Sequence, residues 1–358
     1  MSAIHQFVAG FSRGDAISNE ALVMRDLFRS WGYESHIYAE ARRILPELRS
    51  EARDVCDYPK QAQPGDVVLL HLSIGSIVND VFAGCNGRKV ILYHNVTPPE
   101  YLQGVQEEVA ANLARGREQM KQLAGTADVV LADSRFNARE LEALGYGEVR
   151  VLPLVLDLQK LRGRSDRRLL RTFGDGLVNV LFVGRCVPNK RLEDLLAAFY
   201  YFQKFVEPAS RFIHAGSYAG LERYYAYLLT YARELKLENV VFTGSIRQEE
   251  LNACYRSAHL FLCMSEHEGF CIPVIESMAL EVPVLAYEAA AVPETMGGAG
   301  VLFTEKRFDL VAEMMGRLTG DTAFREAVLK GQRERIARYE HRDPSVELRD
   351  LLKPVLEK

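Results

Sequence analysis

Strand-like apolar runs alternate with helix-like segments along almost the whole of this 358-residue chain, and this alternation restricts the fold more than any other feature. In the first half, predicted strands at 4–9, 66–71 and 89–93 are separated by segments with helical periodicity. Two further helices are predicted at about 100–123 and at 134–144, the second with Ser134 as its N-cap. The same alternation recurs between 178 and 287, with helices predicted at 192–205 and 248–257 and a strand at 284–287. Strands that alternate with helices predict parallel sheets covered by helices on both faces. Ligands of such sheets bind beyond the carboxyl ends of the strands, so the loops there are the candidate functional segments.

The composition is that of a globular protein, with 48% hydrophobic and 26% charged residues. The length favours two domains, and the charged, aperiodic segment 161–168 lies within a predicted boundary from Pro153 to about Gly176. The net charge of -4 argues against nucleic-acid binding. The six cysteines form no Cys-x-x-Cys pair and are predicted to be reduced core thiols, which favours a cytoplasmic protein. Neither a signal peptide nor an apolar run of membrane-spanning length is visible.

The first chemical motif follows a predicted buried strand at 259–264. A loop containing Gly269 leads into a predicted helix that starts at Ile272, with Pro273 in its first turn. A helix start presents backbone N–H groups and a partial positive charge, which suit an anion such as phosphate. Two carboxylates, Glu268 and Glu276, bracket this site. The alternative interpretation makes Glu268 a solvated loop acid and Glu276 an acid on the helix surface.

The second motif places two cations at the end of another predicted strand, 178–183. Gly184 ends that strand, and Arg185 and Lys190 lie in the following loop. These cations stand at the carboxyl end of a predicted parallel strand, which is where ligands of such sheets bind. Arginine offers a planar fork and lysine a compact point charge. The alternative is that both side chains are ordinary solvated loop residues.

Together these motifs resemble a known family. The pattern Glu-Gly-Phe-x-x-Pro-x-x-Glu-x-Met-Ala at 268–279 resembles the hallmark of the family 4 retaining glycosyltransferases, which have the GT-B fold. The loop 184–190 is similar to the family's Gly-Arg-x-x-x-x-Lys loop. The resemblance implies two Rossmann-like domains whose parallel sheets face a central cleft. An acceptor-side domain would comprise 1–153 plus 344–358, and a nucleotide-sugar domain would comprise 154–343.

The resemblance also implies roles for individual residues. Arg185 and Lys190 would hold the diphosphate, Glu276 the ribose, and Glu268 the donor sugar together with neighbouring backbone. His94 would lie near the donor sugar and acceptor, with Asp15 replacing a second glycine after Gly14. Glu281 stands where the family usually has glycine, which puts close helix–strand packing in question. The catalytic candidates are Glu268, Arg185, Lys190 and His94, and the donor-binding candidates are Gly14, Gly184, Ile246, Gly269, Phe270, Cys271, Ile272 and Glu276.

The predicted function is a retaining glycosyltransferase that moves a hexose from a UDP- or GDP-sugar to an acceptor hydroxyl in glycan or polysaccharide assembly. No two aspartates are two residues apart, so no Asp-x-Asp metal clamp exists and neither a metal nor another cofactor is expected. Front-face attack is favoured, and double displacement through Glu268 remains open. The expected acceptor is a glycan, lipid-linked or small molecule, with no nucleic-acid partner and with association at the inner membrane face left open. The alternatives are a nucleotide-sugar epimerase and a non-catalytic nucleotide-sugar-binding protein.

Overall fold

The computed structural model describes residues 3–12 and 14–357, and the chain divides into two compact units. The first unit comprises the described residues up to Glu100, then Glu107–Leu156, then the described residues from Arg342 onward. The second unit comprises Asp157–His341 and the short segment Tyr101–Gln106. The chain passes briefly into the second unit at Tyr101–Gln106. It crosses again after Leu156 and after His341, near the boundaries expected from the sequence at 153 and 343.

The first unit contains a parallel sheet of seven strands in the order β3-β2-β1-β4-β5-β6-β7. The strand order reverses between β1 and β4, which pair in parallel. Ligands of open parallel sheets bind at such a switch point. The three-residue strand β3 was not predicted. The strands are β1 Ile4–Val8, β2 Ile37–Ala39, β3 Ala52–Asp54, β4 Val67–Leu72, β5 Arg88–Tyr93, β6 Val129–Ala132 and β7 Val149–Val151.

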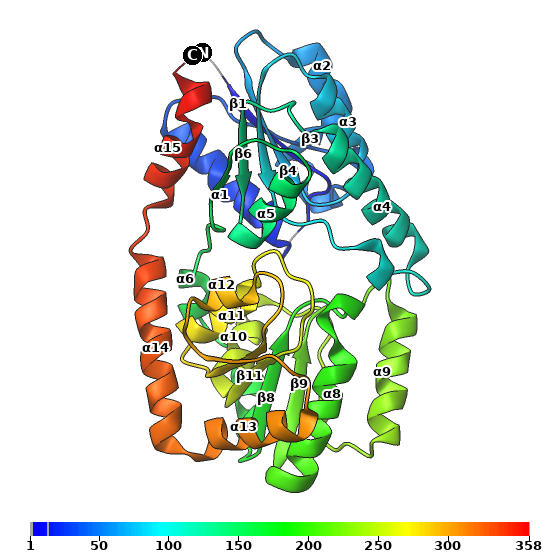
Figure 1. The fold of residues 1–358 in the computed structure, drawn as a ribbon, viewed down its shortest axis with the longest axis vertical. Coiled ribbons are helices and arrows are strands. Elements are labelled where there is room, and N and C mark those ends of the chain that lie inside the picture. The colour runs from blue at the N-terminus through cyan, green and yellow to red at the C-terminus, as the bar shows by residue number, and fades with distance from the viewer. Residues whose placement is uncertain (1–2, 13, 358) are drawn as a thin grey trace. The chain divides into compact units, whose positions relative to one another are not determined.

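The last helix of the chain belongs to the first unit. Helix α15, Pro344–Leu356, lies beside this unit's sheet (Figure 1). Its buried residues Leu348, Leu352 and Val355 pack into the core that contains Ile4 of β1. The helix predicted at 100–123 begins only at Glu107, after a short 3-10 turn. The other helices of this unit are α1 Ala16–Ser30, α2 Tyr58–Gln61, α3 Ile77–Gly84, α4 Glu107–Gln122 and α5 Arg135–Ala143.

The second unit repeats this architecture with a parallel sheet of six strands in the order β10-β9-β8-β11-β12-β13. Its strand order reverses between β8 and β11, so the loops that follow these two strands flank the switch point. Both strands end in the motifs singled out from the sequence. The strands are β8 Val178–Val183, β9 Ser210–Ala215, β10 Val240–Phe242, β11 Leu260–Cys263, β12 Val284–Tyr287 and β13 Val301–Phe303.

The segment expected to be an aperiodic linker is partly helical. Helix α7 begins at Arg167 because the Asp166 carboxylate accepts hydrogen bonds from the backbone N–H groups of Arg168 and Leu169. The predicted helix 192–205 ends as a π-helical turn, Phe202–Val206. The helices of this unit are α6 Gln159–Arg162, α7 Arg167–Phe173, α8 Leu192–Tyr201, α9 Glu222–Glu234, α10 Gln248–Ser257, α11 Ile272–Ala279, α12 Val292–Met296, α13 Phe308–Gly320 and α14 Thr322–Glu340.

Glu281 ends helix α11 in a conformation that glycine adopts more easily. Its φ is +58°, in the left-handed region. The N–H of Val282 donates to the carbonyl of Ser277, and the N–H of Glu281 donates to that of Met278. These two bonds form a Schellman motif with Glu281 at the position glycine usually takes. The glutamate backbone therefore adopts the turn that the end of the helix requires, so the missing glycine does not prevent the chain from leaving α11 toward β12.

Two further sequence expectations concern the cysteines and the membrane. All six cysteines are free thiols. Four are buried, Cys85 is half-buried and Cys56 is exposed. The prediction of a core thiol is therefore wrong for Cys56. Within 3–12 and 14–357, the structure contains no helix with an apolar stretch long enough to cross a bilayer.

Candidate active site

The candidate residues of the second unit gather at one edge of its sheet. Gly184 follows β8, Ile246 follows β10, and Glu268 follows β11. Because all strands of this sheet run parallel, their carboxyl ends lie at the same edge. The structure thus brings together motifs that are more than 60 residues apart in the chain. Sequence reasoning predicted this clustering from the strand pattern alone.

Close backbone packing fixes the end of β8. Gly184 has a φ of +148°, and a Cβ added at Gly216 would lie only 1.8 Å from the Gly184 carbonyl oxygen. His214 also donates from Nε2 to that carbonyl, at 2.9 Å. Glycine is therefore required at Gly216, and the backbone at Gly184 is held in a single path toward the following loop.

Lys190 and Glu268 form an ion pair across the switch point. The Lys190 ammonium donates to Oε1 of Glu268, and their side chains are only 17% and 9% exposed. Burial lowers the pKa of Lys190, but the Glu268 carboxylate outweighs burial and raises that pKa above its usual value. Lys190 is therefore a cation that is already held in place beside a carboxylate. The sequence placed both residues in the site but did not predict their contact.

Asn189 ties the two loops together. Its carbonyl accepts from the N–H of Glu266 at 2.9 Å, and its side-chain amide donates to the carbonyl of His267 at 2.9 Å. Lys306 adds a second restraint, because its ammonium lies 2.6 Å from Glu266 and 2.7 Å from Asp194. Sequence reasoning missed these residues, and no short-range signal marks them. They fix the loop that carries Glu268.

The start of helix α11 is strongly constrained. Cys271 precedes it with a φ of +71°, and Pro273 lies in its first turn. The Thr295 hydroxyl donates to the carbonyl of Phe270, which holds the backbone just before the helix. The N–H groups of a first helical turn lack partners within the helix and can bind an anion. The role of 269–272 in donor binding stays a prediction.

Glu276 is held by a tyrosine that the sequence did not indicate. The buried Tyr255 hydroxyl donates to Oε2 of Glu276 at 2.6 Å. Burial raises the pKa of Glu276, and the bond from Tyr255 opposes that rise. One carboxylate oxygen is thus fixed by the protein, which orients the other for a further hydrogen bond. The side chains of Arg185 and Ile246, at the same edge of the sheet, are exposed and half-buried.

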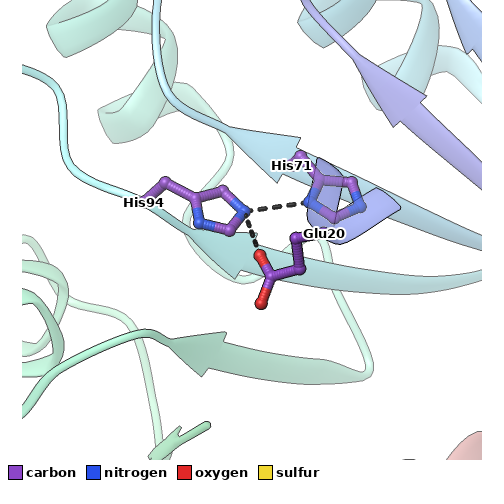
Figure 2. A group of neighbouring side chains, drawn as sticks. All are labelled: Glu20, His71 and His94. Carbon is purple, nitrogen blue, oxygen red and sulfur yellow. Dashed lines mark hydrogen bonds and ion pairs between the residues drawn. The ribbon is translucent and has the colours of Figure 1, made fainter. Parts of the chain in front are cut away.

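Gly14 and His94 belong to the first unit. Gly14 has a φ of +74° in the loop after β1, and Asp15 caps α1 by accepting from the Ser18 N–H at 2.8 Å. Asp15 thus has a structural reason to replace a glycine. His94 directly follows β5, and its buried ring lies beside Glu20 and His71 (Figure 2). Sequence reasoning found His94 but not its neighbours.

The comparisons with known proteins agree with this architecture. Residues 173–339 match the family model described as glycosyl transferases group 1. A GDP-mannose-dependent alpha-mannosyltransferase of Mycobacterium tuberculosis is 32% identical over 52% of this chain and 44% of its own length. The putative teichuronic acid biosynthesis glycosyltransferase TuaC of Bacillus subtilis is 25% identical over 85% of this chain and 75% of its own length. The structure of Anabaena Alr3699/HepE in complex with UDP-glucose superposes with a TM-score of 0.75 at 17% identity, covering 100% of both chains.

The fold and the site define an α/β protein of the GT-B class, as the sequence predicted. Within its second unit, residues 173–339 are similar to the glycosyl transferases group 1 family. The chain spans only 32%, 38% and 44% of the length of three curated relatives that it matches.

Proposed function

We propose that this protein is a retaining, metal-independent glycosyltransferase that moves a hexose from a UDP- or GDP-sugar to an acceptor hydroxyl in glycan assembly. The match of 173–339 to the glycosyl transferases group 1 model supports the reaction class. The observation that carries the proposal is the buried Lys190–Glu268 pair beside the first turn of α11. It combines, in one place, the groups that a sugar diphosphate requires: a fixed cation, a carboxylate and a helix start.

The chemistry follows from the charges in this arrangement. As the bond between the sugar C1 and the diphosphate oxygen breaks, negative charge grows on the leaving group, and Lys190 with Arg185 stabilises it. In this proposal, the Glu268 carboxylate accepts hydrogen bonds from sugar hydroxyls. In front-face attack, the acceptor oxygen bonds to C1 on the face that the diphosphate leaves, and the leaving phosphate oxygen takes the acceptor proton. These cations would take the part that a divalent metal plays elsewhere.

For the donor, we propose that GDP-mannose be tested first. Two relatives bear names that specify GDP-mannose dependence, and a third is named an O-antigen chain mannosyltransferase. UDP-glucose is the second candidate, because Alr3699/HepE was solved with it. The acceptor we propose is a glycan or lipid-linked hydroxyl.

The test combines binding and turnover. A ligand that binds only the folded state raises the melting temperature, so UDP, GDP, ADP and their sugars are compared by thermal shift. The preferred sugar nucleotide is then incubated with an acceptor panel, and the anomeric configuration of the product is read by NMR. Retention of configuration in a new glycoside supports the proposal. Inversion contradicts the retaining mechanism, epimerised donor without acceptor indicates an epimerase, and binding without turnover indicates a binding protein.

A further inference from the structure

A chain of buried polar side chains runs across the sheet of the first unit and ends at His94. Oε1 of Gln6, on β1, lies 2.9 Å from Nε2 of His71, on β4. Nδ1 of His71 lies 2.9 Å from Nε2 of His94, just after β5. All three side chains are at most 9% exposed. Buried polar atoms are hydrogen-bonded to one another, so the hydrogen of each histidine ring must lie on the nitrogen that has an acceptor.

The direction of each hydrogen bond follows from one anchor. The Gln6 amide nitrogen donates to the carbonyl of Ala21 at 2.9 Å, so its oxygen must face His71. That oxygen can only accept, which places the His71 proton on Nε2 and leaves Nδ1 as an acceptor. His94 must therefore donate from Nε2. Burial and the neighbouring His94 both lower the pKa of His71 well below its usual value, so His71 stays neutral and keeps this role.

The geometry of the two rings favours this hydrogen bond between His94 and His71 over a metal site. Glu20, His71 and His94 have ligand atoms within 4.8 Å of one another, as a metal site requires. The ring planes, however, differ by only 6°, and the ring edges face each other with centroids 5.1 Å apart (Figure 2). The nitrogen lone pairs then oppose each other across 2.9 Å. A metal with bonds of about 2.0–2.1 Å to each nitrogen does not fit between them.

The other nitrogen of His94 faces carboxylates. Nδ1 is buried and lacks a hydrogen-bond partner among the residues that the structure describes, and Oδ2 of Asp133 lies 3.6 Å away. Oε2 of Glu20 lies 3.7 Å from the Nε2 atom. Burial lowers the pKa of His94, but Asp133 and Glu20 outweigh burial and raise it above its usual value. The titratable and charged groups around this cluster are Asp15, Glu20, His71 and Asp133, with Arg342 acting on Glu20.

Glu20 has a second contact that holds it in place. Its Oε1 atom accepts from the backbone N–H of Val155 at 3.2 Å, two residues before the chain leaves the first unit. Burial raises the pKa of Glu20 to about 7, and His94 opposes that rise. The carboxylate therefore cannot move away from His94 without losing a backbone hydrogen bond. This contact makes Glu20 a fixed neighbour of the imidazole.

We propose that Gln6, His71 and Glu20 are positioning residues that keep the proton of His94 on Nε2 at all times, so that Nδ1 is the nitrogen that gains and loses a proton. The carboxylates of Asp133 and Glu20 lie beside the ring and favour its protonated form. His94 thus keeps its Nε2 proton and one ring orientation in both of its protonation states. The tautomer assignment stands on this geometry alone, whereas its kinetic consequence rests on the proposed glycosyltransferase function.

The direct test is ¹⁵N NMR of the histidine rings in the full-length protein, with His94 assigned through His94→Asn. We expect Nε2 of His94 to remain protonated while Nδ1 titrates. Glu20→Gln and Asp133→Asn should each lower the titration midpoint, by at least the roughly tenfold change in proton affinity that a nearby opposite charge produces. Glu118→Gln, an exposed acid of α4, is the matched control and should leave the midpoint unchanged. An unmoved midpoint in both cluster variants, or loss of the Nε2 proton first, overturns the proposal.

Gln6→Met provides a second test, because it removes the oxygen that fixes His71. We expect His71 to move its proton to Nδ1 and neutral His94 to change to the Nδ1–H tautomer. If the wild-type tautomer persists in folded Gln6→Met, Gln6 is not the anchor. If this variant does not fold, the wild-type and Glu20→Gln titrations still decide the proposal. Stoichiometric Zn²⁺ binding to wild type that disappears in Glu20→Gln would instead identify a metal site and overturn the proposal.

The kinetic test separates this inference from the proposed function. In Glu20→Gln, the alkaline limb of the pH–activity profile should move to lower pH, with the same direction as the NMR midpoint. An unchanged limb beside a shifted midpoint refutes the role of His94 protonation in the reaction. If no glycosyl transfer occurs with any donor while the titrations behave as expected, the proposed function fails and the tautomer assignment stands.

Discussion

Replacing Lys190 by alanine tests the central ion pair of the candidate site. The substitution removes a held cation and leaves the Glu268 carboxylate, which is only 8% exposed, without this partner. Two separate effects are expected. Turnover falls because the leaving diphosphate loses a preorganised charge, and stability falls because a buried carboxylate loses its counter-ion.

Both magnitudes follow from the geometry. Removing one preorganised group at developing charge typically lowers turnover about 100- to 1000-fold. Breaking a buried pair by removing one partner costs about 3–5 kcal/mol, and the partial exposure of this pair reduces the cost to about 2–4 kcal/mol. For a domain of this size, each kcal/mol lowers the melting temperature by about 2–4 °C. Lys190→Met combined with Glu268→Gln leaves no unpaired charge and should recover much of the stability, but not the turnover.

The assay measures steady-state rates at saturating donor, donor affinity by calorimetry, and thermal unfolding. Lys330→Ala removes an exposed lysine from α14 of the same unit and serves as the matched control, with wild-type behaviour expected. Arg185→Ala should also lower turnover, and the two losses should not add, because both cations serve one leaving group. Near-wild-type turnover in Lys190→Ala would refute the diphosphate role. A double variant no more stable than Lys190→Ala would refute the unpaired-carboxylate reasoning.

Four further outcomes are expected. Glu276→Ala should weaken nucleotide binding about tenfold to a hundredfold, since a charge-assisted hydrogen bond contributes about 1.5–3 kcal/mol. Tyr255→Phe should weaken nucleotide binding less. Unchanged nucleotide affinity of both variants in calorimetry would contradict the role of Glu276 at the ribose. Activity should survive excess EDTA, and loss on chelation with rescue by magnesium or manganese would refute the metal-free mechanism. Burial lowers the pKa of His214 to about 4, so the unfolded state binds this proton first and stability falls as the pH drops from about 6.5 to about 4, by up to about 3 kcal/mol. Urea unfolding of His214→Gln should show a smaller slope but not a zero slope, because burial also lowers the pKa of His5 to about 4. Equal slopes in the variant and the wild type would contradict this. Glu281→Gly should raise the free energy of unfolding by up to about 1 kcal/mol, because glycine adopts a left-handed backbone conformation without the strain of a side chain. The substitution loses only an exposed ion pair with Arg333. A lower melting temperature of the variant would show that the ion pair contributes more than the strain costs.

The sequence predicted the repeated strand–helix alternation and the loops that carry the candidate site. Strands β8 and β12 and helix α10 have the predicted bounds. Each has a clear apolar pattern with turn residues directly beside it, so both ends can be predicted from the local sequence. Ser134 was predicted to cap α5 and does so, by accepting from the Asn137 N–H at 3.2 Å. Helix α7 was missed, because its charged residues conceal a helix that the Asp166 cap starts. Short elements such as β3 carry too few residues for a period to appear.

Only the tertiary structure decided which side chains meet. Lys190 and Glu268 are 78 residues apart and come together because β8 and β11 are neighbours in the sheet although two strands separate them in sequence. Tyr255 reaches Glu276 from a different helix. His71 meets His94 because β4 and β5 pair in register and both residues lie near the carboxyl ends. Local patterns determine which segments form strands and helices, whereas strand order and register, set by packing of the whole core, determine the contacts on which a site depends.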